Sequence, residues 1–253
     1  SMFSATSYEV MDQAVRQRSV DIAFLSGKLA LDAVTVHGMH VIAQVVRQDG
    51  LPGYRALLLA RRQGQPTSLD AVLADPSLWR LARGEKRSMS GYIVPKLELF
   101  LPRGIDIETR FRDEIVGTHQ QTALALINDR ADVATSNTAD FDRFKNQFPA
   151  EAAQLRTLWQ SELIPHGFIV IRRPPGDELH ERAKRFLTEY GRGPGKPADE
   201  QRARLKQVQV FAGFVKADNR ALLPVAELTR KLDLDSAASA QWINDAARQG
   251  RLQ

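Results

Sequence analysis

The chain has 253 residues, which fits one large domain or two units of ordinary size. With 43% hydrophobic and 26% charged residues it has the composition of a globular protein, and no apolar run approaches the roughly eighteen residues of a membrane span. The absence of cysteine excludes disulfides and thiolate metal sites. The net charge of +5 comes from basic residues scattered among 30 acids, so we expect a surface that attracts small anions and no nucleic-acid partner.

Strand-like and helix-like segments alternate in the first part of the chain, which predicts an α/β fold. The hydrophobic periodicity and the turn residues predict a strand at 2–5, a helix at 8–18, a strand at 20–25, a helix at 28–37, and strands at 40–46 and 54–60.

The pattern changes after residues 61–66, which are polar apart from Gly64 and Pro66. A short helix is expected after Thr67 and Ser68, whereas residues 75–86 show no strong core segment. Helices are predicted at 91–101, 118–128 and 178–190, with strands at 132–135, 156–159 and 168–172, and the remainder is expected to be mostly helical and polar.

One turn carries the clearest chemical signal. Ser88, Ser90 and Gly91 stand just before a predicted helix, directly after Lys86 and Arg87. Hydroxyls and free backbone N–H groups at a helix start can hold one small anion such as phosphate or phosphonate. An ordinary helix cap has the same residues, and on this turn alone capping is the better interpretation.

Signs of catalysis are lacking. The sequence shows no nucleophile–base–orienter triad, no paired acids at a plausible spacing and no phosphate-loop lysine, so we expect a binding protein and no enzyme. We also expect no cofactor and no metal, because four histidines lack metal-ligand spacing and are expected at the surface or in caps: His37, His40, His166 and His180.

Several motifs, in order and with matching spacing over residues 3–225, resemble one known family: the phosphonate- and phosphite-binding (PhnD-like) solute receptors of bacterial ABC importers. The matching segments are Ala5–Tyr8, Val20–Phe24, Gly50–Tyr54, Ser88–Pro95, Thr118-His119 with Asp132–Thr138, and Trp159–Pro165 with Tyr190–Pro194.

The resemblance implies a two-lobed periplasmic-binding-protein fold of type II, with lobe one at 3–61 plus 165–253 and lobe two at 64–162. Two hinge strands are expected near 57–62 and 164–170, with a small phosphorus oxyanion bound between the lobes. It further implies an ABC permease as partner and a periplasmic location, although the first residues carry no signal-peptide pattern. A sensor or regulatory module of the same fold is the alternative. The effector domain of a transcription regulator would need a helix-turn-helix, which we do not find.

The resemblance also assigns roles to residues. Ser88 and Ser90 would donate hydroxyls to the oxyanion and Met89 a backbone N–H, within the turn that ends at Gly91. His119 matches a histidine that contacts the oxyanion, with a pKa that would rise beside a dianion. Two tyrosines, Tyr8 and Tyr54, match residues that line the ligand cleft.

The chain departs from the family at several of these places. Met89 replaces a threonine, and Ser26 follows a strand where the family has other residues. Four further positions are candidate ligand contacts: Ser26, Thr138, Ala139 and Gly167. Family members that take aminoalkylphosphonates carry one carboxylate directly after the position of Thr138 and another two residues beyond the position of Ile164-Pro165. In this chain Ala139 and Gly167 occupy these two positions. A buried ammonium would then be unpaired, so methylphosphonate, phosphite or phosphate is expected to bind better than an aminoethyl ligand.

Two further expectations complete the comparison with the family. Asp140, one position late, is expected to face outward, although it could substitute for the missing carboxylate. The family opens with a strand and a helix that this sequence lacks, which predicts an unpaired sheet edge filled by a second copy of the chain or by a partner, or a natural truncation. A homodimer is therefore one of the expected partners.

Overall fold

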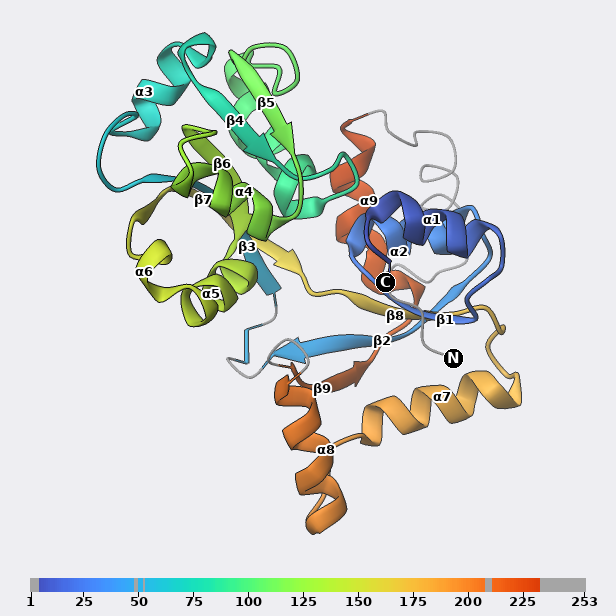
Figure 1. Ribbon diagram of the computed structural model, residues 1–253. Helices are drawn as coiled ribbons and strands as arrows, with labels where there is room; N and C mark the ends of the chain where they lie inside the picture. Colours follow the sequence, from blue (N-terminus) through green and yellow to red (C-terminus); the bar gives the residue numbers. More distant parts are fainter. Residues whose placement is uncertain (1–4, 48–49, 52, 208–210, 233–253) are drawn as a thin grey trace. The chain divides into compact units, whose positions relative to one another are not determined.

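The computed structural model describes residues 5–47, 50–51, 53–207 and 211–232. Contacts divide the chain into two units, one of Ser1–Pro52 with Pro165–Gln253 and the other of Gly53–Ile164 (Figure 1). The strand expected at 2–5 lies almost entirely outside the described residues. Within the described ranges, no helix combines the length and the apolar character that crossing a membrane would require.

The first unit is built on a four-stranded antiparallel sheet in the order β1-β8-β2-β9. Its strands are β1 (Ile22–Leu25), β2 (His40–Arg47), β8 (Phe168–Ile171) and β9 (Phe211–Lys216). Its helices are α1 (Tyr8–Arg16), α2 (Gly27–Thr35), α7 (Glu178–Glu189), α8 (Lys196–Gln207), η5 (Asn219–Leu222) and α9 (Leu223–Arg230). Figure 1 shows α2 on one side of β2 and β8 and α7 on the other, so the sheet is covered on both faces.

The second unit contains a five-stranded mixed sheet in the order β5-β4-β6-β3-β7. Its strands are β3 (Gly53–Arg61), β4 (Arg80–Arg83), β5 (Asp113–Val116), β6 (Val133–Asn137) and β7 (Leu155–Pro165), the last ending one residue beyond the unit. Its helices are α3 (Leu69–Ala74), η1 (Pro76–Leu78), η2 (Met89–Ile93), η3 (Pro95–Phe100), η4 (Leu101–Arg103), α4 (His119–Ile127), α5 (Thr138–Gln147) and α6 (Pro149–Ala152). Strand β4 runs parallel to β5 and β6, and β3 runs antiparallel to β6.

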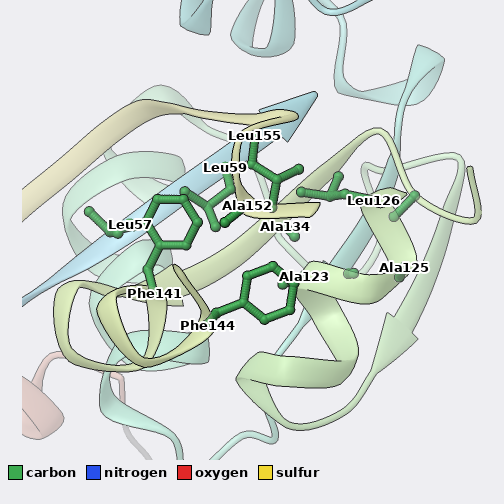
Figure 2. Packing of buried hydrophobic residues seen from close by; sticks show 12 residues of the cluster. Leu57, Leu59, Ala123, Ala125, Leu126, Ala134, Phe141, Phe144, Ala152 and Leu155 are labelled. Carbon is green, nitrogen blue, oxygen red and sulfur yellow. The ribbon is translucent and has the colours of Figure 1, made fainter. Parts of the chain in front are cut away.

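Helices α4, α5 and α6 pack on this mixed sheet through a cluster of buried apolar side chains. Figure 2 shows Phe141 and Phe144 of α5 facing Leu57 and Leu59 of β3 and Leu126 of α4. Leu126 is fully buried. Burying such side chains is the main favourable contribution to the stability of this unit.

Polar side chains fix where the helices begin. Thr118 and Gln121 form a reciprocal capping box at α4, and Asn137 accepts the Asp140 N–H at the start of α5. These two caps matter for function, because they set the positions of the first residues of α4 and α5 beside β6.

Residues 75–86 are a correction to the sequence-based expectation. They contain β4, whose Leu81 and Ala82 are fully buried between β5 and β6. The strand is only four residues long and has arginines at both ends, so its apolar character is diluted. Both arginines are paired: Arg80 Nη2 lies 2.8 Å from Asp132 Oδ1, and the Arg83 guanidinium makes two bonds to Glu114.

Other elements also differ from the sequence-based expectation. The exposed edge strand β5, strand β9 and helices α5 and α6 were not expected, and residues 156–159 are part of the longer β7. The chain passes between the units after Pro52 and after Ile164. Residues 54–60, which we assigned to lobe one, thus lie in the second unit because β3 pairs with β6.

We expect Leu126→Ala to lower the free energy of unfolding of the protein by about 2–5 kcal/mol, because it leaves a cavity in the core of the second unit. Leu78→Ala in the same unit is the matched control. Leu78 is half exposed, so its loss should be about 1 kcal/mol or less. Urea unfolding measures both, and equal losses would contradict the assigned packing.

Candidate functional site

The Ser88–Gly91 turn, which forms the start of η2, is held by an unusually close approach of two glycines. The Gly84 N–H donates to the Gly91 carbonyl at 3.0 Å. A Cβ on Gly91 would lie 2.7 Å from Gly84 Cα and 2.7 Å from Ser88 Oγ, so only glycine fits this position. The Thr135 hydroxyl of β6 also donates to the Gly91 carbonyl, at 2.8 Å. The turn is therefore anchored to both β4 and β6.

Ser88 caps the turn, as the simpler interpretation of the sequence expected. Its Oγ accepts the Gly91 N–H at 3.0 Å, which leaves the hydroxyl hydrogen available as a donor. The N–H groups of Met89 and Ser90 belong to the first turn of the helix, where no intrahelical acceptor exists. Capping and anion binding are thus compatible at this serine.

Ser90, His119 and Asn137 are brought together from three separate elements. Ser90 Oγ lies 3.0 Å from His119 Nε2 at the start of α4, and Asn137 Nδ2 at the end of β6 donates to Ser90 Oγ at 3.1 Å. Ser90 and Asn137 are buried, and His119 is half-buried. The structure therefore places Ser88, Ser90 and His119, three of the predicted site residues, within one unit and joins two of them directly.

The imidazole of His119 sits in an enclosed environment. Burial lowers its pKa, an effect that Asp140 and the Thr135 carbonyl partly offset and Arg143 reinforces. Its Nδ1 atom is buried and has no hydrogen-bond partner within the described part of the chain. The lowered pKa favours the neutral ring, in which one of the two nitrogens carries the proton.

Asp140 does not face outward as expected. Its Oδ2 accepts from Asn137 Nδ2 at 2.8 Å, and its backbone N–H donates to Asn137 Oδ1 at 2.8 Å. Its second oxygen lies 3.2 Å from Arg143 Nη1. The carboxylate is therefore committed to the cap of α5 and to Arg143.

A charged cluster lies behind the turn. Tyr92 is almost fully buried, and its hydroxyl donates to Glu108, which also accepts from Lys86 and Lys96. The hydrogen bond from Lys86 and then that from Tyr92 hold the pKa of Glu108 at about 2, against a smaller opposing effect of burial. The Arg83 guanidinium lies 5.0 Å from the centre of the Tyr92 ring. This cluster fixes the residue that follows the Ser-Met-Ser-Gly turn.

The other residues predicted for the second unit lie on neighbouring elements. Thr138 Oγ1, at the first position of α5, accepts the N–H of Arg55 at 3.2 Å. Tyr54 directly precedes Arg55 on β3, and Ala139 follows Thr138. Tyr54, Thr138 and Ala139 are half-buried.

The remaining predicted residues lie in the first unit, each in its own setting. Tyr8 opens α1 after the Ser7 cap, and Ser26 opens α2 with a buried Oγ that has no partner in the described residues. Gly167 lies under an aromatic ring: a Cβ there would lie 2.5 Å from Phe24 Cε2.

Two histidines differ from expectation. His166 and His180 are buried instead of exposed. A ring nitrogen of each lies near a backbone carbonyl, at 3.1 Å from Leu51 O for His166 and 2.9 Å from Arg173 O for His180. Their role is to satisfy backbone groups, which a sequence pattern does not reveal.

Asn137 and Thr135 were missed as site residues. The motif that contains them was recognised, but only Thr138 was assigned a role. The available signal was an asparagine at a strand end with an aspartate three residues later, a pattern typical of a helix cap.

The chain matches the family model described as "ABC transporter, phosphonate, periplasmic substrate-binding protein" over residues 1–222. The chain belongs to this family. Among curated relatives, the phosphonates-binding periplasmic protein of Escherichia coli K12 is 29% identical over 243 residues, which is 96% of this chain and 70% of the relative.

Solved structures agree with this assignment. A binding protein component of an ABC phosphonate transporter from Pseudomonas aeruginosa matches with a TM-score of 0.84 and 30% identity, over 98% of this chain and 83% of that one. PhnD1 from Prochlorococcus marinus, solved with methylphosphonate, matches with a TM-score of 0.74 and 17% identity, over 91% of this chain and 85% of that one. The α/β fold with two sheets is thus the type II periplasmic-binding-protein fold that the sequence predicted.

We expect Gly91→Ala to destabilise the protein by about 1–3 kcal/mol, because the added methyl group must displace backbone at Gly84. Gly117→Ala is a milder comparison, since its methyl group would meet the Gln121 side chain of the α4 cap instead of backbone. Urea unfolding compares the two. An unfolding free energy of the Gly91 variant equal to that of the parent would show that the glycine contact is not needed.

Glu108→Gln should lower the unfolding free energy at pH 7 by about 1–2 kcal/mol, a value discounted because Lys86 is exposed. The folded-state pKa of Glu108 is depressed from 4.5 to about 2, so its contribution is present above pH 4.5 and is lost as the pH falls toward 2. Chemical unfolding at pH 7, 4 and 3 should show the difference between variant and parent shrinking with acidification. Asp142→Asn, which breaks an exposed pair with Lys145, controls for loss of a surface carboxylate.

Proposed function

We propose that this protein binds a small phosphorus oxyanion and serves as the solute receptor of an ABC importer, with Ser88, Ser90 and His119 as principal contacts. The observation that carries the assignment is the convergence of donors in the second unit. The Ser88 hydroxyl, the Ser90 hydroxyl and the first-turn N–H groups of Met89 and Ser90 belong to one buried turn, and the His119 imidazole adjoins it.

These donors suit an anion of high charge density. Hydroxyl and backbone N–H groups held by the surrounding fold can donate to several oxygens of one oxyanion without first reorganising. Three of the cations near the turn are already paired, Lys86 and Lys96 with Glu108 and Arg83 with Glu114. Directional hydrogen bonds from neutral groups would therefore supply most of the recognition.

The substituent on phosphorus should be small and uncharged. Ala139 offers no carboxylate, and the Phe24 ring lies where a side chain at Gly167 would stand. Asp140, which could have replaced the missing acid, is engaged by Asn137 and Arg143. An ammonium group would thus lack a counter-charge from these positions, at a cost in desolvation.

Transport is the role that family membership favours. We propose a periplasmic location, an ABC permease as partner and no catalytic turnover, in line with the relatives named as periplasmic binding proteins. A sensor of the same fold would bind the same ligands, and uptake by cells that carry or lack the gene would separate the two. Tyr8, Tyr54, Ser26 and Thr138 remain predicted contacts that single substitutions can test.

Binding can be tested by thermal shift and calorimetry with phosphate, phosphite, methylphosphonate and 2-aminoethylphosphonate. We expect methylphosphonate or phosphite to raise the melting temperature and to bind at least tenfold more tightly than 2-aminoethylphosphonate. Ser90→Ala should weaken binding by tenfold or more, because it removes a buried donor. No shift with any of these anions would contradict the proposed function, and preference for the aminoethyl compound would contradict the proposed ligand.

A further inference from the structure

The hydroxyl of Ser90 is one end of a chain of hydrogen bonds that leads out of the proposed site. From Ser90 Oγ the chain runs to Asn137 Nδ2 at 3.1 Å and from the same nitrogen to Asp140 Oδ2 at 2.8 Å. Ser90 and Asn137 are 3% and 4% exposed, so water competes little for these bonds.

The orientation of the Asn137 amide is fixed by its neighbours. The Asp140 backbone N–H needs an acceptor and lies 2.8 Å from Asn137 Oδ1, so the oxygen must face α5. The nitrogen then faces both Asp140 and Ser90, and each of its two hydrogens has an acceptor. If the amide were reversed, its oxygen would face Asp140 Oδ2 and its NH2 group would face the Asp140 backbone N–H. Neither pair could form a hydrogen bond.

This arrangement decides the role of Ser90. Because Asn137 donates to Ser90 Oγ, the serine hydrogen cannot point toward Asn137 and must be donated elsewhere. The two remaining directions are His119 Nε2, at 3.0 Å, and an incoming ligand. When Nε2 carries a proton and donates to Ser90, both lone pairs of the serine are used, and the hydroxyl can only donate to the ligand.

We propose that Asn137 is a positioning residue that holds the Ser90 hydroxyl as a hydrogen-bond donor, so that the site selects oxyanions with an unprotonated oxygen at Ser90. This inference rests on the proposed function and deepens it. A carboxylate at position 137 would accept the Ser90 hydrogen and remove the donor from the ligand. If the residue at position 137 served only to cap α5, asparagine and aspartate there would be equivalent, because the two cap helices about equally well.

A transposed pair of variants separates donor orientation from capping, at the same net charge as the parent. In Asn137→Asp with Asp140→Asn, the new amide at 140 can donate to the new carboxylate at 137, and the aspartate can still accept the backbone N–H. The charge of the protein is unchanged. Asp140→Asn alone is the reference, because it keeps the Asn137 donor and includes the loss of the ion pair with Arg143.

We expect the transposed double variant to bind methylphosphonate at least tenfold more weakly in calorimetry than the parent, which has the same net charge, and than Asp140→Asn, which has lost the same ion pair with Arg143. The three melting temperatures should lie within a few degrees of each other. The deficit should shrink as the pH is lowered, because a protonated Asp at position 137 again presents a donor. Ser68→Asp, which adds a carboxylate at the cap of α3, should bind like the parent.

Each result has a defined meaning. Equal dissociation constants for the double variant and Asp140→Asn, with the parent binding normally, would overturn the role of Asn137 and leave the proposed function intact. No binding of methylphosphonate, phosphite or phosphate by the parent would overturn both. Should the double variant fail to fold, Asn137→Ser serves instead: serine keeps an oxygen cap but cannot bridge to Ser90, and unweakened binding would refute the proposal.

Discussion

The carbonyl oxygen of Gly91 is the point on which the candidate site depends. It accepts from the Gly84 N–H at the end of β4 and from the Thr135 hydroxyl on β6. These two bonds hold the Ser-Met-Ser-Gly turn against two strands that are themselves parallel neighbours. The positions of Ser88 and Ser90 follow from this anchorage, and so does the contact of Ser90 with His119. A turn left to itself would lose this geometry to its own conformational entropy.

Several formal charges in the surroundings of the turn are paired with one another. Arg83 lies between Glu114 and the Tyr92 ring, and the ammonium groups of Lys86 and Lys96 converge on Glu108. Neutral hydroxyl, amide and imidazole groups are left facing the site. Recognition by such groups depends on direction more than on net charge, so the protonation of both partners becomes part of specificity.

Much of this could be anticipated from the sequence, and the failures have physical reasons. The motifs identified the family, the fold and the turn at Ser88–Gly91, because short local patterns carry them. The core strand β4 was missed because two arginines flank its two buried residues, and their partners Asp132 and Glu114 lie far away along the chain. The inward turn of Asp140 was missed for a similar reason, since it depends on the amide of Asn137 and not on helical periodicity.

The contact between Phe24 and Gly167 constrains how the protein can change. A side chain at 167 would collide with the ring of Phe24 and would also lie 3.0 Å from the Leu25 carbonyl. An acidic residue at position 167 therefore requires the Phe24 ring, which is 44% exposed, to turn aside or a smaller residue to stand at position 24. A counter-charge at position 167 thus depends on a second residue, and the two positions are expected to change together.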